Sequence, residues 1–208
     1  MEIIKFILHI DKYLASIITL FGSGTYVFIF LIIFAETGLV VTPFLPGDSL
    51  IFAAGAFAGS GSLNIWTIYT VIVAAAIIGD TVNYMIGYHV GPKVFSKDNS
   101  RLFNKAYLLK AQAFYEKRGG MTIILARFIP IIRTFAPFVA GIGKMHYSAF
   151  IFYNIAGAFA WTSLFVFTGY YLGSIPFVQT HFEYVIIAII LISIIPFITE
   201  TIKSRRKT

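Results

Sequence analysis

The chain has 208 residues and a formal net charge of +7, and 58% of its residues are hydrophobic while only 12% are charged. With a mean hydropathy of +0.84, this composition excludes an ordinary soluble domain and indicates an integral membrane protein. The absence of cysteine excludes disulfides and thiolate metal sites, and the four scattered histidines lack ligand spacing, so no metal site is expected.

Residues 1–22 are predicted to form an amphipathic helix. Their polar side chains, from Lys5 to Thr19, recur every three or four residues and so form one stripe. Such a helix lies at the membrane interface or packs beside other helices rather than spanning the bilayer. No removed signal peptide is expected, because no short apolar run leads into a small-residue cleavage site.

Residues 26–92 are expected to form a first repeat. Residues 26–41 and 65–88 are apolar enough to cross the bilayer. Between them, residues 43–60 begin with helix breakers and leave only about ten apolar residues, about 15 Å of helix or half a hydrocarbon core. This piece is predicted to be a re-entrant hairpin, and its breaking residues are Pro43, Pro46 and Gly47.

Residues 93–120 are rich in lysine and arginine and are expected to form a partly helical, basic linker. A second repeat is expected at residues 121–176. In its first part, residues 121–143, Pro130 and Pro137 are expected to break the chain into short helices around two arginines.

Residues 150–172 and 184–202 are each long enough to span, and residues 203–208 form a basic tail. By the positive-inside rule, the basic linker and the tail are both cytoplasmic. Two spans already connect them, so residues 121–143 must return to the cytoplasmic side. They are therefore predicted to be a second re-entrant hairpin, which enters from the face opposite to the first.

Two pairs of motifs indicate an inverted repeat. PGDSLIFAAG and PIIRTFAPFVAG each place a charged residue after a proline and end in Ala-Gly, and IGYHVGP and TGYYLGS share Gly-Tyr. Similar units of opposite orientation are typical of transporters whose broken elements build the substrate site. For the Gly-x-x-x-Gly spacing in the second pair, ordinary helix packing is the favoured interpretation. The whole chain, 1–208, is then one all-α polytopic membrane domain.

Five ionisable residues inside the apolar runs are candidate functional residues. Insertion of such a residue at the centre of a transmembrane helix costs about 2.5–3.5 kcal/mol of free energy, so each is expected to face partners or water. Arginine stays protonated and offers a fork of donors suited to phosphate oxygens, whereas buried carboxylates can take up and release protons. Structural ion pairs or hydrogen bonds are the alternative, equally weighted for Asp80. The candidates are Arg127 and Arg133 for phosphate and Glu36, Asp48 and Asp80 for protons.

Long motifs of the chain closely resemble those of the DedA family of bacterial inner-membrane proteins, also called the SNARE-associated or VTT-domain family. The motifs are FAETGLVVTPFLPGDSLIFAAGAFA, GDTVNYMIG, FYEKRGGMTIILARFIPIIRTFAPFVAGIGKM and IPFVQ. The resemblance runs nearly end to end. It implies a multi-pass inner-membrane protein with two re-entrant hairpins in inverted arrangement, and both termini are expected in the cytoplasm.

The resemblance also implies function. Family members are linked to envelope integrity, dependence on the proton motive force and movement of lipids across the bilayer, including undecaprenyl phosphate and phospholipids. The family's functional positions fall here on Glu36, Asp48, Arg127 and Arg133. These implications favour a translocase, a flippase or scramblase, for a phosphate-bearing lipid.

Two other classes stay open. A proton-coupled antiporter of small cations or drugs would need the acids and tolerate lysine in place of the arginines, and a non-transporting scaffold would tolerate exchanged charges. Enzymatic activity is not expected, because no nucleophile and base are recognisable together. The predicted partners are a membrane lipid and protons, with no cofactor and no nucleic acid. The lipid, the direction of transport and a homo-oligomeric state are left open.

Overall fold

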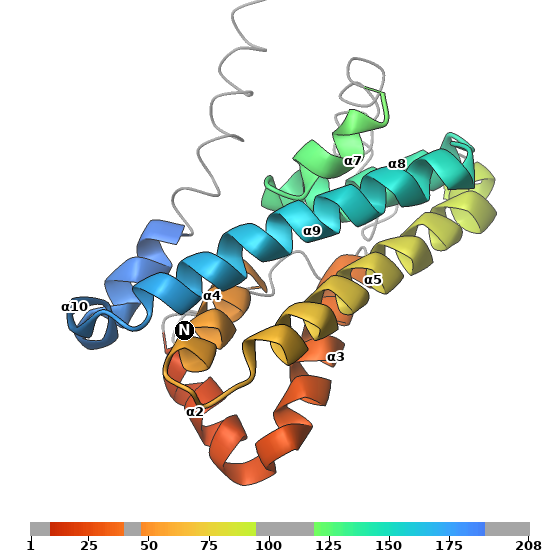
Figure 1. Cartoon of the computed structure of the whole chain (residues 1–208). Coiled ribbons are helices and arrows are strands. Elements are labelled where there is room, and N and C mark those ends of the chain that lie inside the picture. The colour runs from red at the N-terminus through yellow and green to blue at the C-terminus, as the bar shows by residue number, and fades with distance from the viewer. Residues whose placement is uncertain (1–8, 40–46, 95–118, 190–208) are drawn as a thin grey trace, which may run out of the picture. The chain divides into compact units, whose positions relative to one another are not determined.

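The computed structural model of the chain describes residues 9–39, 47–94 and 119–189 (Figure 1). These residues form helices and turns and include no strand, which confirms the all-helical prediction for them. They divide into two compact units. Unit 1 takes the described residues of Met1–Ile32, Pro46–Ala74 and Trp161–Thr208, and unit 2 those of Ile33–Leu45 and Ala75–Ala160.

Three stretches of the described residues are long and apolar enough to cross a membrane, which supports the assignment as a membrane protein. Two of them contain the predicted spans 65–88 and 150–172 and correspond to α5 (Ile65–Val94) and α9 (Tyr147–Leu172). The predicted span 184–202 lies mostly outside the described residues, as do the linker from 95 to 118 and the tail.

The third candidate stretch, Ile10–Gly38, bends in its middle. It consists of α2 (Ile10–Phe21), a short 3-10 turn (Gly22–Gly24) and α3 (Thr25–Gly38), and the two helices meet at an angle in Figure 1. Gly22 has a φ of +53°, which glycine adopts without steric cost. The predicted helix at residues 1–22 is thus confirmed over the described part of that range.

The predicted crossing at residues 26–41 differs from the observed helix. α3 has 14 residues, which corresponds to about 21 Å of helix against a hydrocarbon core of about 30 Å. α3 alone is therefore too short to cross upright, and the candidate span includes α2, for which an interfacial position was predicted.

Unit 1 is built around α4 (Gly47–Gly59) and the second half of α9, with the short α10 (Pro176–Thr180) beyond it. α4 and α9 approach so closely that a Cβ on Gly55 would overlap the carbonyl oxygen of Val166. A Cβ on Gly169 would likewise overlap that of Phe52. Close contact of this kind requires glycine on both helices.

Unit 2 contains α7 (Met121–Ala126) and α8 (Pro130–Ile142), and α8 packs against the second half of α5. A Cβ on Gly87 would overlap the carbonyl oxygen of Phe138, and one on Gly141 would overlap that of Tyr84. The spacing is the same as in unit 1. In both units, each helix of the pair has a glycine, and the carbonyl oxygen three residues before that glycine contacts the glycine of the other helix.

The prolines of the second predicted hairpin behave differently from one another. Pro130 is the first residue of α8, and Ile129 before it is extended (φ −124°, ψ 103°), as a residue before proline prefers. Pro137 lies inside α8, which continues to Ile142, so the prediction that Pro137 breaks the helix is wrong. Neighbouring helices can satisfy backbone groups freed by an intramembrane proline. The carbonyl oxygen that Pro137 leaves without its intrahelical N–H is that of Arg133, and Asn83 of α5 donates to the next carbonyl oxygen, that of Thr134.

The first predicted hairpin is described only in part. Gly47 is the first residue of α4, which agrees with a helix that begins there. Pro43 and Pro46 lie outside the described residues. A tight turn with Gly61 at φ +82° follows α4, and Asn64 then caps α5, its Oδ1 accepting hydrogen bonds from the backbone N–H of Trp66 at 3.1 Å and Thr67 at 3.0 Å.

Candidate functional site

Unit 2 places Arg127 against a carboxylate and an amide. Its Nη2 lies 2.7 Å from Asp80 Oδ2 and also donates to Asn154 Oδ1. Asn154 in turn donates from Nδ2 to the carbonyl oxygen of Ile77 at 3.1 Å, which fixes the orientation of the amide. Arg127 and Asp80 are each 1% exposed, so this is a buried ion pair.

The local fold explains how so large a side chain fits here. Arg127 follows the last residue of α7, in the turn that Pro130 ends. Its aliphatic part crosses α9 at Gly157, where an added Cβ would lie 3.1 Å from both Cδ and Nε of Arg127 and 3.2 Å from the Cα of Ile124. Gly157 therefore makes room for the arginine.

Replacement of Gly157 with valine should displace Arg127 from Asp80. Because the two charges would stay buried without their partner, we expect the variant to lose about 2 kcal/mol or more of stability. Thermal unfolding in detergent measures this loss. Ala160→Val, at an exposed position of the same helix, is the matched control, and equal behaviour of the two variants would contradict this role for Gly157.

The second arginine forms a second buried ion pair in unit 2. Arg133, in α8, donates from Nη2 to Oε1 of Glu36 in α3. Arg133 is 4% exposed and Glu36 is fully buried. The predicted break in the chain at Pro130 is therefore present. The turn before Pro130 separates the two arginines into different segments, and each arginine pairs with a carboxylate from another helix.

Asn83 connects the helices that carry the two pairs. Its Nδ2 donates to the carbonyl oxygens of Thr37 at 3.0 Å and Thr134 at 2.8 Å, and so links α5 to α3 and α8. α3 and α5 also approach closely at two glycines, since a Cβ on Gly38 would lie 3.3 Å from the Cα of Gly79. Asp80 follows Gly79 directly, and Glu36 lies two residues before Gly38, so both carboxylates are close in sequence to this contact.

The charges of the two pairs cancel, since two arginines and two carboxylates give +2 − 2 = 0. Two acceptors beside them, Asp80 Oδ1 and Asn83 Oδ1, are buried and have no hydrogen-bond partner among the described residues. A buried carboxylate or amide oxygen without a partner is costly. These two oxygens can therefore accept a hydrogen bond from a further donor.

Asp48 belongs to unit 1. It lies in the first turn of α4, and its Oδ1 accepts a hydrogen bond of 3.0 Å from Nε1 of Trp161, a fully buried residue of α9. Of the five predicted residues, four thus meet as two ion pairs in unit 2, and the fifth is bound to an indole in unit 1.

Sequence reasoning missed Asn154, Gly157 and Trp161 as parts of these arrangements. Asn154 had a usable signal, because a single amide inside the apolar run FIFYNIAGAF is expected to bond across helices. Gly157 and Trp161 carried none, since glycine and tryptophan are ordinary residues of apolar helices. Only the path of the Arg127 side chain and the position of Asp48 reveal their roles.

The VTT domain matches residues 45–171. The chain is 52% identical over 206 residues to Protein DedA of Escherichia coli K12, covering 98% of this chain and 94% of that protein. It is 43% identical over 178 residues to an uncharacterized membrane protein of Mycobacterium tuberculosis H37Rv, covering 85% and 78% of the two chains.

A more distant relative is inner membrane protein YghB of Escherichia coli K12, which is 30% identical over 172 residues, covering 83% of this chain and 78% of that protein. No solved structure matches the chain significantly. The domain match and the identity over nearly the full length agree with the resemblance of the motifs, and the chain belongs to the DedA family of VTT-domain membrane proteins.

Proposed function

We propose that the protein is a translocase, a flippase or scramblase, that moves a phosphate-bearing lipid across the membrane. The lipid would be undecaprenyl phosphate or a phospholipid, and its transport would support the integrity of the envelope. The observation that carries the proposal is the pair of buried arginines in unit 2, each held by a carboxylate from another helix. Arginine is the side chain best suited to bind phosphate away from water.

The balance of charge suggests how such a site would work. A phosphate monoester that enters as a dianion would replace the carboxylates of Glu36 and Asp80 on the arginines. If each carboxylate takes up one proton as it is displaced, the site stays neutral, which avoids the large cost of net buried charge. Transport would then be coupled to protons and respond to the proton motive force. In this proposal Asp48 is a third proton-coupling residue, on α4 in unit 1.

We also infer that α4 and the α7–α8 pair belong to two re-entrant hairpins of an inverted repeat. α7 has 6 residues, or about 9 Å of helix, and α4 and α8 have 13 residues each, or about 20 Å. Each of these helices is too short to span the bilayer. The matching glycine contacts support the repeat, because α4 meets α9 in unit 1 with the same spacing as α8 meets α5 in unit 2.

The membrane and its orientation are part of the proposal. The name of the relative YghB, an inner membrane protein, supports an inner-membrane location. The basic linker and tail, residues 93–120 and 203–208, support a cytoplasmic position for both. With the first crossing directed outward, the N-terminus would also be cytoplasmic.

Reconstitution in liposomes tests the proposed function. Labelled undecaprenyl phosphate, phosphatidylethanolamine and a neutral lipid would be supplied with and without a pH gradient. We expect the protein to move the phosphate-bearing lipids faster than the neutral one. Equal movement of all three would contradict recognition of the head group. No movement of any would favour a proton-coupled antiporter or a scaffold.

A further inference from the structure

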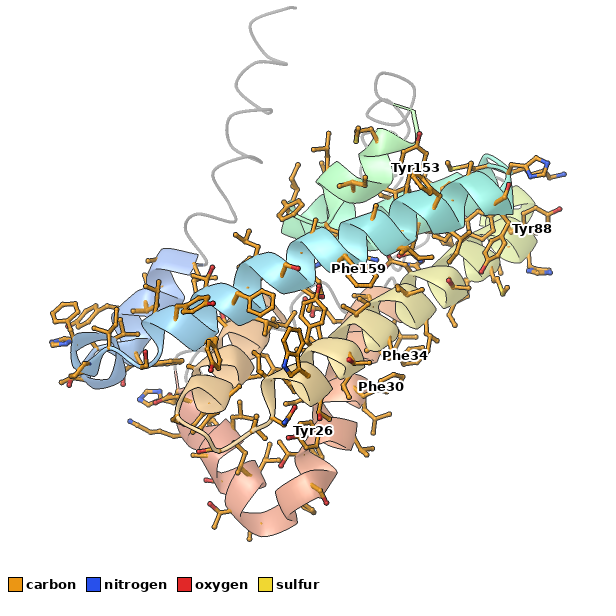
Figure 2. All side chains as sticks on the ribbon, in the orientation of Figure 1. Tyr26, Phe30, Phe34, Tyr88, Tyr153 and Phe159 are labelled. Atoms are coloured by element: carbon orange, nitrogen blue, oxygen red, sulfur yellow. The ribbon has the colours of Figure 1, made fainter. Side chains whose placement is uncertain are left out.

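Unit 2 contains a cavity that is distinct from the buried ion pairs. It has a volume of about 520 Å³ and lies between the C-terminal part of α5 and the turn that joins α8 to α9. This volume is within the usual range for small-molecule sites, about 300–1,000 Å³. Tyr88 extends from the last turns of α5 (Figure 2) and lines the cavity together with Tyr84, His89, Lys144 and His146.

The chemistry of the lining suits an anion. It offers the ammonium of Lys144, the imidazoles of His89 and His146 and the hydroxyls of Tyr88 and Tyr147, and none of its eight residues is acidic. Lys144 forms no ion pair with any described residue, and both it and His146 are exposed. A lysine ammonium is a common ligand of phosphate. Among the described residues, the cavity therefore presents positive charge with no carboxylate in its lining to neutralise it.

The backbone holds Lys144 in place at a steric cost. Lys144 has a φ of +51° and is the one residue other than glycine with positive φ in the described part of the chain. It follows the end of α8, with Lys144 N–H bonded to the carbonyl oxygen of Gly141 at 3.0 Å and Met145 N–H to that of Ala140 at 2.9 Å. This is the Schellman arrangement, in which glycine normally takes the left-handed position. Strain of this kind points to a role for the side chain.

One residue of the cavity wall, Tyr84, lies one helical turn from Asp80 on α5. Tyr84 lines the cavity, donates from its hydroxyl to the carbonyl oxygen of Met145 and stacks on Phe150 at a ring-centroid distance of 4.5 Å. Asp80, Tyr84 and Tyr88 are spaced by four residues and so lie on one face of α5. One turn of helix, about 6 Å, separates Tyr84 from the carboxylate that holds Arg127.

We propose that this cavity binds the phosphate monoester head group of a membrane lipid, as a docking site that precedes the buried arginines. The proposal rests on the proposed lipid transport and adds a second phosphate site to it. The candidate span Ile65–Val90 is about 39 Å long and ends at the cavity. The cavity thus lies at the level of the head groups, and its half-exposed Met85, Tyr88 and Tyr147 can meet acyl chains.

Direct binding separates the docking site from the arginines. The full-length chain in a phosphate-free detergent would be titrated with decyl phosphate and with inorganic phosphate. The double variant Glu36→Gln/Arg133→Gln removes one buried pair and keeps the site neutral, so that phosphate at the cavity can be measured. We expect this variant to bind decyl phosphate, and addition of Lys144→Gly to weaken that binding by about tenfold or more, the loss expected for a charge-assisted hydrogen bond.

The single variant Lys144→Gly also distinguishes a loss of binding from a loss of folding. Glycine relieves the positive φ, so we expect the single variant to melt about 2–4 °C higher than the wild type while it binds decyl phosphate less tightly. Lys144→Arg should retain binding. Lys12→Gln, which removes the same charge from an exposed position of α2 in unit 1, should bind like the wild type.

The outcomes distinguish the two proposals. If the wild type binds decyl phosphate but Glu36→Gln/Arg133→Gln binds none, the cavity is not a docking site and the proposed function stands. Unchanged binding in Lys144→Gly would likewise overturn the inference and leave Lys144 as an interfacial anchor. Inorganic phosphate bound as tightly as decyl phosphate would assign the cavity to free phosphate instead of a lipid. A wild type that binds neither probe would contradict both proposals.

Discussion

Replacement of Arg133 with lysine is expected to reduce transport of a phosphate-bearing lipid by roughly ten- to hundredfold, the equivalent of one lost charge-assisted hydrogen bond. Lysine keeps the positive charge and can still pair with the buried Glu36. It loses the planar fork that binds two phosphate oxygens at once. Initial rates in liposomes measure the effect, and a melting temperature close to that of the wild type would show that the fold is kept.

Three results are informative for Arg133. Full activity of Arg133→Lys would contradict the binding of two phosphate oxygens by the guanidinium of Arg133. It would favour the antiporter, for which the arginine needs only its charge. Lys12→Arg, the reverse exchange at an exposed position, is the control and should have no effect. The exchanged pair Glu36→Arg/Arg133→Glu keeps an ion pair, so a scaffold would keep function with it, whereas a translocase should lose transport.

Replacement of Asp80 with alanine is expected to destabilise the protein by about 3–5 kcal/mol, because it leaves the guanidinium of Arg127 buried without its carboxylate. For a protein of this size, a loss of that much free energy of unfolding should lower the melting temperature by roughly 10 °C. The double variant Asp80→Ala/Arg127→Met removes both charges and should recover much of that stability. Thermal unfolding of the single and double variants in detergent measures the coupling between the two residues.

Transport should respond differently from stability. Both Asp80→Ala and the double variant should lose transport, since the first lacks the exchangeable carboxylate and the second the phosphate ligand. If the double variant transports lipid normally, the Asp80–Arg127 pair is structural, the alternative that the sequence left open for Asp80. The opposite outcome, recovery of stability without recovery of activity, would separate a functional pair from a structural one.

The sequence was sufficient for the helical class and for the residues that carry charge into the membrane. Length and hydropathy identified the helices now seen as α5 and α9, and the cost of intramembrane charge identified all four members of the buried ion pairs. These predictions depend on local composition and on free energies of transfer, which a single sequence contains.

The pairing of those charges could not be predicted, because it depends on how helices cross. The sequence indicated three acids and two arginines without their pairing, and the structure shows that Asp80 of α5 holds Arg127, Glu36 holds Arg133 and Trp161 holds Asp48. Pro137 was misjudged for a related reason. A proline breaks an isolated helix in water, but neighbouring helices can supply partners for the freed backbone groups inside a membrane protein.

In the proposed cycle a phosphate replaces the two carboxylates on the arginines, and the number of protons that move with each lipid measures that exchange. Liposomes that contain the protein, a phosphate-bearing lipid and an internal pH dye would report both lipid movement and proton flux. We expect protons to move with the lipid in the same direction, up to about two for each dianion so that the site stays neutral, and the coupling to disappear in Glu36→Gln/Asp80→Asn. Lipid movement by the wild type without any proton movement would show that phosphate does not exchange with protonated carboxylates at the arginines.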